Sequence, residues 1–232
     1  MSGPKILRRT ISWLTFLFVA YAGSLFAQTD TEYWPEVQFY HKLNEQFRVR
    51  IAAGATRSEP LSGYKDRYLE SDLDVGFKNI VGRKRQPDEH KGKYLSMRFG
   101  YSYHENSSDK PPENRVIAEV TSRFPLPGLF LASDRNRLDF RSIGGDDSKR
   151  YRNRVRLERE YTIGHLKFSP YGEAEFYYDS RVDGWNRNEY TFGSEFPIRK
   201  RFVLEFYYAY QNNKGSGTTD VNGLATVLQI HW

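Results

Sequence analysis

The last ten residues of the chain, GLATVLQIHW (223–232), decide the fold. Every second residue from Leu224 to Trp232 is bulky and apolar except Thr226, whereas the residues between them are smaller or more polar. Because side chains of a β-strand point alternately to its two faces, this pattern predicts a strand with one apolar face and one more polar face. The apolar face includes the terminal aromatic residue.

A last strand that ends on an outward aromatic is similar to the C-terminal signal of bacterial outer-membrane β-barrels. We therefore expect Leu228, Ile230 and Trp232 to form an assembly signal for the barrel-assembly machinery. These three residues share one face of the strand, and we expect that face to contact outer-membrane lipid.

The other end of the chain also indicates export. Three basic residues between Lys5 and Arg9 precede an apolar run over residues 11–22, and small residues follow up to Ala27. This layout predicts a secretory signal peptide, residues 1–27, that is cleaved after Ala27. The run is shorter than the ~20 residues of a membrane-spanning helix, so an uncleaved anchor is the alternative. Removing the signal peptide lowers the net charge from +6 to +3, because it holds three basic residues and no acidic one.

The composition argues against several kinds of site. The chain has no cysteine, which excludes disulfides and thiolate metal sites. A mature charge of +3 without a recognisable motif argues against nucleic acid as a partner, and no spacing of His, Asp and Glu resembles a metal site. We therefore expect no metal and no cofactor. Aromatic residues make up 16% of the chain while its mean hydropathy is only −0.74, as expected if each strand is apolar on one face alone.

Residues 46–232 form successive segments of about ten residues, the length of a tilted strand that crosses a bilayer. The odd-numbered residues from Leu95 to Tyr103 are bulky and mostly apolar, for example, and the even-numbered ones between them are small or charged. We predict an all-β fold: a closed, antiparallel, up-and-down transmembrane β-barrel of about ten strands over residues 46–232.

Short and long links between these strands alternate, as in barrels with short turns at one rim and long loops at the other. Residues 143–150 and 179–186 are two of the expected long polar loops. The link over residues 79–93 is long where a short turn is due, and we expect an excursion on the periplasmic side. Its charge run, Arg83-Lys84-Arg85, is expected to be solvated rather than to form a binding site.

Residues 28–45 do not fit this scheme easily. The last strand must end in the periplasm, so ten strands from residue 46 onward can close antiparallel onto it. A strand over residues 34–42 would be an eleventh that starts outside the cell, whereas bacterial single-chain barrels normally have even strand numbers. The pairing of residues 28–45 therefore stays open: outside a ten-stranded ring, through its lumen, or, with one more short strand, in a ring of twelve.

Alternation alone does not decide which face points inward. A soluble periplasmic barrel like a lipocalin would enclose the apolar face, and it stays an alternative. Outward apolar faces are favoured by the export signal, by bulky side chains too numerous for a small barrel interior, and by Tyr and Trp near strand ends, where membrane girdles lie. We therefore expect an integral protein of the outer membrane of a Gram-negative bacterium.

With this orientation the lumen collects the charges. The expected lumen charge cluster consists of Arg135, Arg137, Arg141, Arg152, Arg154, Arg156, Glu158, Glu173, Glu175, Glu189 and Glu195. Unpaired charges in a narrow lumen are costly, so ion pairs are expected. Two interpretations stay open: salt-bridged side chains that fill a closed barrel, and a narrow, porin-like pore or ligand-binding barrel whose ionic or small-molecule cargo the sequence does not name.

Several motifs resemble one family of bacterial outer-membrane proteins, domain of unknown function 2490. They are Trp34 before the first amphipathic segment, Asp134-Arg135-Asn136-Arg137, Tyr151-Arg152-Asn153-Arg154, Pro170-Tyr171 with Glu173 and Glu175, residues 188–193, and Tyr210-Gln211. The resemblance covers most of the mature chain and is best from residue 134 onward. It implies an outer-membrane location and a β-barrel fold, and it implies no reaction.

A catalytic role has one candidate residue. Some outer-membrane barrels are lipid hydrolases with a Ser–His pair that faces the bilayer, and His104 lies close in sequence to Glu105, Ser107 and Ser108. A serine nucleophile needs a base within hydrogen-bond reach and an orienting acid, which proximity in sequence does not provide. We therefore expect no enzyme and no catalytic residue, with lipid hydrolysis as the alternative.

Overall fold

The computed structural model describes residues 29–58, 64–80, 88–106, 111–215 and 218–232. The predicted signal peptide and the predicted charge run Arg83-Lys84-Arg85 lie outside the described residues. The elements are β1 (Asp30–Lys42), β2 (Phe47–Ser58), β3 (Tyr64–Asn79), η2 (Glu89–Gly92), β4 (Lys93–Asn106), β5 (Glu113–Pro125), η3 (Pro127–Leu129), β6 (Phe130–Ile143), β7 (Asp146–Arg159), β8 (Tyr161–Ile163), β9 (Leu166–Asp179), β10 (Gly184–Arg199), β11 (Phe202–Asn213) and β12 (Val221–His231). In these parts of the chain, no helix is long and apolar enough to cross a membrane.

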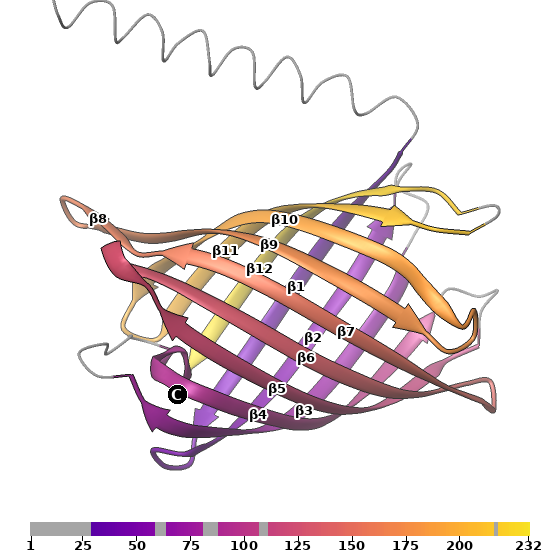
Figure 1. Ribbon diagram of the computed structural model, residues 1–232, viewed down its shortest axis with the longest axis horizontal. Helices are drawn as coiled ribbons and strands as arrows, with labels where there is room; N and C mark the ends of the chain where they lie inside the picture. The colour runs from indigo at the N-terminus through magenta and orange to yellow at the C-terminus, as the bar shows by residue number, and fades with distance from the viewer. Residues whose placement is uncertain (1–28, 59–63, 81–87, 107–110, 216–217) are drawn as a thin grey trace, which may run out of the picture.

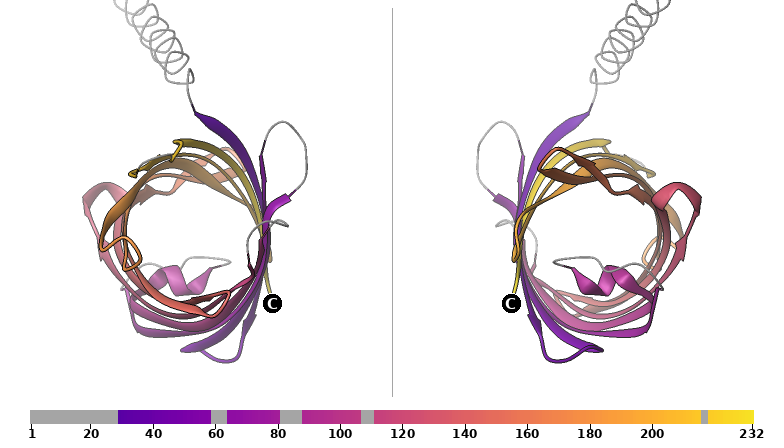
Figure 2. Two further views of the ribbon diagram at one scale, coloured as in Figure 1. Left: turned by 90° about the vertical axis from the view of Figure 1, so that its right-hand side faces the viewer. Right: turned by 90° about the vertical axis from the view of Figure 1, so that its left-hand side faces the viewer.

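Eleven of the described strands close into one ring, in the order β1 to β7, then β9 to β12 and back to β1. The strands wind obliquely around a common axis (Figures 1 and 2). Neighbouring strands in this ring are antiparallel except β12 and β1, which run parallel with Trp34 opposite Ala225 and Phe39 opposite Ile230. The short β8 lies outside the ring and pairs with the start of β9. The predicted all-β, closed barrel is therefore confirmed.

The strand number corrects the prediction of ten strands, or twelve. Residues 30–42 lie in the ring as β1, so they neither stay outside the barrel nor thread its lumen. Strand directions alternate along the chain, so an odd number of strands forces the first and the last to run parallel rather than antiparallel. The end of this seam is hydrogen-bonded: the Lys42 N–H donates to the Trp232 carbonyl at 2.9 Å, and the Trp232 N–H donates to the Tyr40 carbonyl at 2.8 Å.

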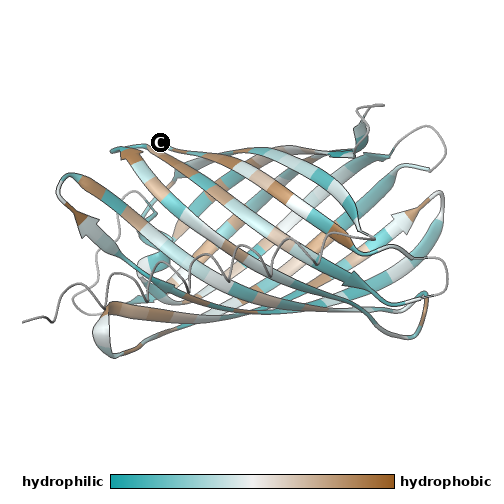
Figure 3. Ribbon diagram, turned by 90° about the horizontal axis from the view of Figure 1, so that it is seen from above, coloured by the Kyte–Doolittle hydropathy of each residue, from teal (hydrophilic) through white to brown (hydrophobic). Residues whose placement is uncertain are grey.

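Apolar side chains point outward from the ring and charged side chains point inward. Leu69, Val116 and Phe192 are 57%, 56% and 67% exposed, whereas Asp72 and Glu175 are each 3% exposed. Figure 3 shows the resulting alternation of hydrophilic and hydrophobic residues along the strands. A lipocalin-like barrel would enclose its apolar face. The strand faces of this barrel therefore have the opposite orientation to those of a lipocalin-like barrel.

Residues 143–150 differ from the long polar loop expected from the sequence. β6 and β7 stay paired up to Ile143 and Asp146, with Gly144 and Gly145 as the connection. Both glycines have positive φ, 60° and 100°, which is the conformation that a two-residue hairpin turn favours. The charged residues here belong to the strand ladder, because the strands continue past their apolar segments.

Two inward glycines let aromatic rings lie close to the barrel wall. A Cβ atom on Gly193 would lie 2.6 Å from the ring of Tyr171, and one on Gly54 would lie 2.5 Å from the ring of Tyr68. Only glycine permits such an approach. Both rings therefore lie against the wall, which leaves room in the lumen for the charged side chains.

Candidate functional site

The lumen contains two adjoining cavities lined largely by charged and aromatic side chains. The inner chamber has a volume of about 390 Å³. The outer vestibule, at the rim of the β2–β3, β4–β5, β9–β10 and β11–β12 links, has a volume of about 700 Å³. Among the described residues, the side chains that line both cavities are Glu36, Tyr68, His104, Arg115, Arg152, Glu189 and Tyr207. This layer marks the boundary between the chamber and the vestibule.

Most of the predicted lumen charges line the inner chamber. They are Arg135, Arg137, Arg152, Arg154, Arg156, Glu158, Glu173, Glu175, Glu189 and Glu195. The exception is Arg141, which is buried but lines neither cavity. Its guanidinium donates to Glu113 and, at 2.9 Å, to Asp179, so Arg141 joins β6 to β5 and β9.

Arginines of β6 and β7 are paired with glutamates of β9 and β10. Arg135 Nη2 donates to Glu175 Oε1 at 2.6 Å, and Arg152 Nε donates to the same oxygen at 2.7 Å. Arg156 Nη2 donates to Glu195 Oε1 at 2.7 Å. Charge-assisted hydrogen bonds offset the desolvation of buried charges, so these pairs make a charged lumen compatible with a folded barrel.

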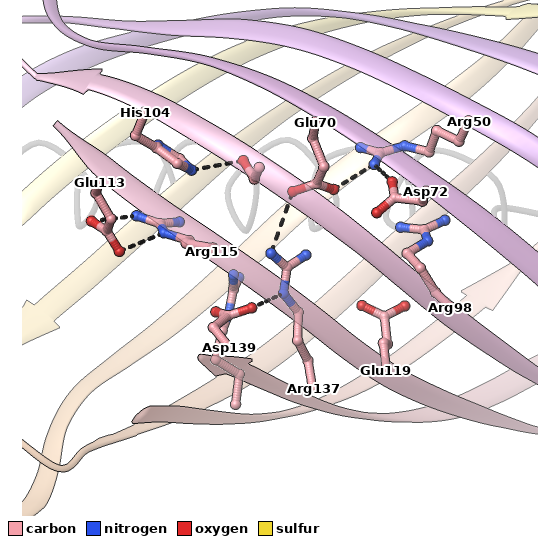
Figure 4. A network of polar contacts seen from close by, with 12 residues as sticks. Arg50, Glu70, Asp72, Arg98, His104, Glu113, Arg115, Glu119, Arg137 and Asp139 are labelled. Carbon is pink, nitrogen blue, oxygen red and sulfur yellow. Dashed lines mark hydrogen bonds and ion pairs between the residues drawn. The ribbon is translucent and has the colours of Figure 1, made fainter. Parts of the chain in front are cut away.

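Sequence reasoning missed a second set of lumen charges, on strands β2 to β6, and Figure 4 labels several of them. These residues are Arg48, Arg50, Glu70, Asp72, Asp74, Arg98, Glu119 and Asp139. Arg137 joins them, with its Nη2 3.4 Å from Glu70 and its Nε 2.6 Å from Asp139. The alternation of side chains along each strand could have identified these residues, because each of them lies on the face opposite the bulky apolar residues.

The short helix η2 lies inside the ring (Figure 2). Asp88 accepts a hydrogen bond from Arg48 Nη1 at 2.6 Å, and it caps η2 by accepting from the His90 N–H at 3.0 Å. Lys91 donates to Glu195 on β10 and lies 3.7 Å from Glu158 on β7. The expected periplasmic excursion is thus corrected for residues 88–92, which turn inward because luminal charges pair with them.

The electrostatic environment of η2 is set by burial and by the facing charges. Burial opposes ionisation of Asp88, but Arg48 and other nearby cations outweigh it and hold the pKa of Asp88 well below its usual range. Burial, followed by the charge of Arg48, lowers the pKa of His90 to about 4. His90 is 6% exposed, and neither ring nitrogen has a hydrogen-bond partner in the described part of the chain. His90 is therefore held neutral at pH 7.

We expect the barrel to lose stability as the pH falls from about 6.5 to about 4. The pKa of His90 is about 6.5 in the unfolded chain and about 4 in the fold, so the unfolded chain binds more protons in this window. The loss is at most about 1.4 kcal/mol per pH unit. The charged groups around His90 are Arg48, Asp74, Asp88 and Arg123.

The measurement is the free energy of unfolding from pH 7 to pH 4, for the wild type and for His90→Gln. The difference between the two curves isolates the imidazole, because the neighbouring charges are the same in both. Two parallel curves would contradict the prediction.

One histidine has a hydrogen-bond arrangement like that of a catalytic triad. His104 Nε2 lies 3.0 Å from Ser102 Oγ, and His104 Nδ1 lies 3.1 Å from Asp66 Oδ2. Neither Glu105, which is exposed, nor Ser107 and Ser108, which lie outside the described residues, forms this group. Ser102 is 0% exposed and lines neither cavity. The Ser102 hydroxyl is therefore enclosed within the barrel wall.

Residues 89–222 match the family described as "Protein of unknown function (DUF2490)", over more than half of the chain. The chain belongs to this family. The match confirms the family resemblance read from the sequence, and no curated protein matches the chain. In this DUF2490 chain the matched region begins at η2 and ends at the start of β12, so it contains all eleven of the predicted lumen charges. Within the described residues, no group of three or more His, Asp or Glu is placed to hold a metal ion.

Proposed function

We propose that this DUF2490 protein is an integral β-barrel of the bacterial outer membrane whose charged lumen admits small solutes. One observation carries the proposal: each strand of the ring has at least one large apolar side chain exposed on the outside, while the inside is charged. Apolar surface of this extent is unfavourable in water, at roughly 25 cal/mol per Å², and marks a contact with lipid or protein. A lipid bilayer would cover such a surface around the whole ring.

The location is tested by cell fractionation and by gel migration. The mature protein is expected in the outer-membrane fraction, and its unheated sample is expected to migrate differently from the boiled sample in detergent gels, as folded barrels do. Recovery of the folded protein from the soluble periplasm would refute the proposed location.

Phe192→Arg is expected to destabilise the barrel in lipid vesicles by about 2–4 kcal/mol, the cost of arginine at the bilayer midplane. Phe192 is 67% exposed and lies midway along β10. Val182→Arg is the matched control, because Val182 is 62% exposed in the turn before β10 and should remain in water. Urea unfolding in vesicles measures both. Equal effects of the two substitutions would argue against a lipid-facing β10.

The conduit version of the proposal is tested by planar-bilayer conductance of the purified barrel. A narrow, charge-lined lumen predicts small currents that depend on the salt. If no current flows at any voltage, the lumen is a binding chamber or a closed support rather than a pore. The inner chamber would still be available to ligands from the vestibule.

The proposed assembly signal lies on the outward face of β12. Leu228, Ile230 and Trp232 alternate with the buried Val227 and Gln229. Trp232 is 64% exposed, with the Arg201 guanidinium 4.1 Å from its ring centre. We propose that this face is recognised by the barrel-assembly machinery before lipid surrounds it.

Trp232→Ala is expected to lower the amount of folded barrel in cells severalfold, while the unfolding free energy of purified protein falls by less than about 1 kcal/mol. The reason is that most of the indole is exposed. Phe202→Ala is the control, because Phe202 is 38% exposed on β11 and pairs with Ile230. The folded fraction is read from heat-modifiable gels. Normal assembly of Trp232→Ala would contradict the proposed role of Trp232 in the assembly signal.

We do not propose lipid hydrolysis. A hydrolase of the expected kind needs its Ser–His pair toward the bilayer, whereas His104 lines the lumen and Ser102 is covered. His104→Ala should therefore leave any phospholipid or lipid A turnover of the preparation unchanged. Turnover that is present in the wild type and lost in His104→Ala would establish the enzyme instead.

A further inference from the structure

The charges around the inner chamber are divided unevenly between its two walls. Among the described residues, β1 and β9 to β12 contribute six glutamates and no Arg or Lys to its lining. Strands β2 to β7 contribute ten arginines and three glutamates. One wall is therefore acidic and the other basic, and this separation produces an electric field across the lumen.

Among the described residues of the chamber lining, three charged side chains have only neutral partners: Arg123 on the basic wall, and Glu189 and Glu205 on the acidic wall. Glu189 on β10 accepts from the Tyr177 hydroxyl at 3.2 Å and from the Gln211 amide at 2.6 Å. Arg123 on β5 donates to the Ser96 hydroxyl at 2.9 Å. Glu205 on β11 accepts from the Tyr171 hydroxyl and, at 3.0 Å, from the Gln229 amide. Within the described parts of the chain none of these three side chains has an ion pair within 4 Å. Glu205 is only 7% exposed, so an uncompensated carboxylate there is costly unless a cation reaches it.

Arg123 and Glu205 face each other across the chamber. β5 and β11 are on opposite sides of the eleven-stranded ring, separated by five seams in one direction and six in the other. Arg123 lies two residues before the end of β5, and Glu205 lies three residues after the start of β11. Both strand ends are at the rim where η2 connects β3 to β4, so both charges lie toward that end of the chamber, whereas Glu189 lies at its boundary with the vestibule.

The chamber suits a small ligand that carries both charges. Its volume is about 390 Å³, within the size range of small-molecule sites. A simple anion would meet the six glutamates, and a simple cation would meet the ten arginines. A zwitterion can complement both walls at once, with access from the vestibule because η2 occupies the other end.

We propose that the inner chamber binds small zwitterions, with the carboxylate of the ligand at Arg123 and its ammonium group at Glu205. This inference rests on the proposed function, in which the lumen admits small solutes, and it names their chemical class. The reason is charge complementarity: such a ligand supplies Arg123 and Glu205 each with the opposite charge.

The test compares three probes with the same four-carbon chain: 4-aminobutyrate, butyrate and butylammonium. Isothermal titration calorimetry of the folded, detergent-solubilised barrel at pH 7 measures their binding. We expect 4-aminobutyrate to bind at least about tenfold more tightly than either singly charged probe, because each charge contributes one charge-assisted contact. Equal binding of the three probes, or no binding of 4-aminobutyrate, would overturn the inference.

Two variants should each remove the preference for 4-aminobutyrate over one of the singly charged probes. Glu205→Gln should lose the preference for 4-aminobutyrate over butyrate, and Arg123→Gln should lose it over butylammonium. Arg187→Gln is the matched control. Arg187 donates a hydrogen bond to Asn213 at 2.7 Å, and it lines the vestibule but not the inner chamber. This variant should bind 4-aminobutyrate as tightly as the wild type does. Unchanged preferences in both chamber variants would refute the site, and if a variant misfolds the wild-type comparison still decides.

The zwitterion site and the conduit proposed above can be refuted independently of each other. A barrel that binds 4-aminobutyrate but carries no current would support the zwitterion site and refute the conduit. A barrel that conducts but binds the three probes equally would support the conduit and refute the zwitterion site.

Discussion

Replacing Arg156 with Met is expected to lower the free energy of unfolding of the barrel by about 3–5 kcal/mol, because it leaves buried carboxylates without their cation. Arg156 Nε lies 3.0 Å from Glu158, its Nη2 donates to Glu195 at 2.7 Å, and its Nη1 lies 3.9 Å from Glu173. The guanidinium also lies 3.6 Å from the ring centre of Tyr171. Urea unfolding in lipid vesicles measures the change.

Arg159→Met on the same strand is the control. The Arg159 guanidinium lies 5.1 Å from the ring centre of Phe130 and 4.7 Å from that of Tyr161, and no ion pair joins it to any described residue. Its loss should cost no more than about 1 kcal/mol. The double variant Arg156→Met/Glu195→Gln should recover part of the loss, since one unpaired charge is removed. Similar losses for Arg156→Met and Arg159→Met would show that the luminal ion pairs do not support the fold.

Removing the contacts of η2 is expected to raise the single-channel conductance severalfold. In the variant Asp88→Ala/Lys91→Ala, η2 loses its bonds to Arg48 and Glu195, which attach it to β2 and β10. Each such charged bond contributes about 1.5–3 kcal/mol, so their joint loss should release η2 from the end of the inner chamber. Planar-bilayer recordings at neutral pH measure the conductance.

Lys200→Ala is the control for conductance, because Lys200 is an exposed residue of the β10–β11 turn at the same rim. Its current should equal that of the wild type. The unfolding free energy of the η2 variant should also be measured, because a folded barrel is needed for the comparison. An unchanged current from a folded variant would show that η2 does not limit conduction.

Much of the fold could be predicted from local alternation. The outward face of β12, from Leu224 to Trp232, and the inward charges of β6, β7, β9 and β10 have the predicted phase. Phase is local, because consecutive side chains of a strand must point to opposite faces. The same logic placed ten of the predicted charges at the inner chamber without any knowledge of strand partners.

Other features needed information from distant parts of the chain. The polar stretch 143–150 resembled a loop, because its ladder partners are visible only once β6 and β7 are paired. The Ser102–His104–Asp66 contact joins two neighbouring strands, and its aspartate is 38 residues from the histidine. No spacing rule could have found that group.

The sequence by itself determined an all-β barrel, which residues face outward, and a lumen rich in Arg and Glu. Tertiary structure alone decided that eleven strands close through a parallel seam between β1 and β12, and that Lys91 reaches Glu195 across 104 residues of chain. The physical reason is that the two-residue period of a strand is set by its own backbone. Ring closure and charge pairing instead depend on how all the strands are arranged around one lumen.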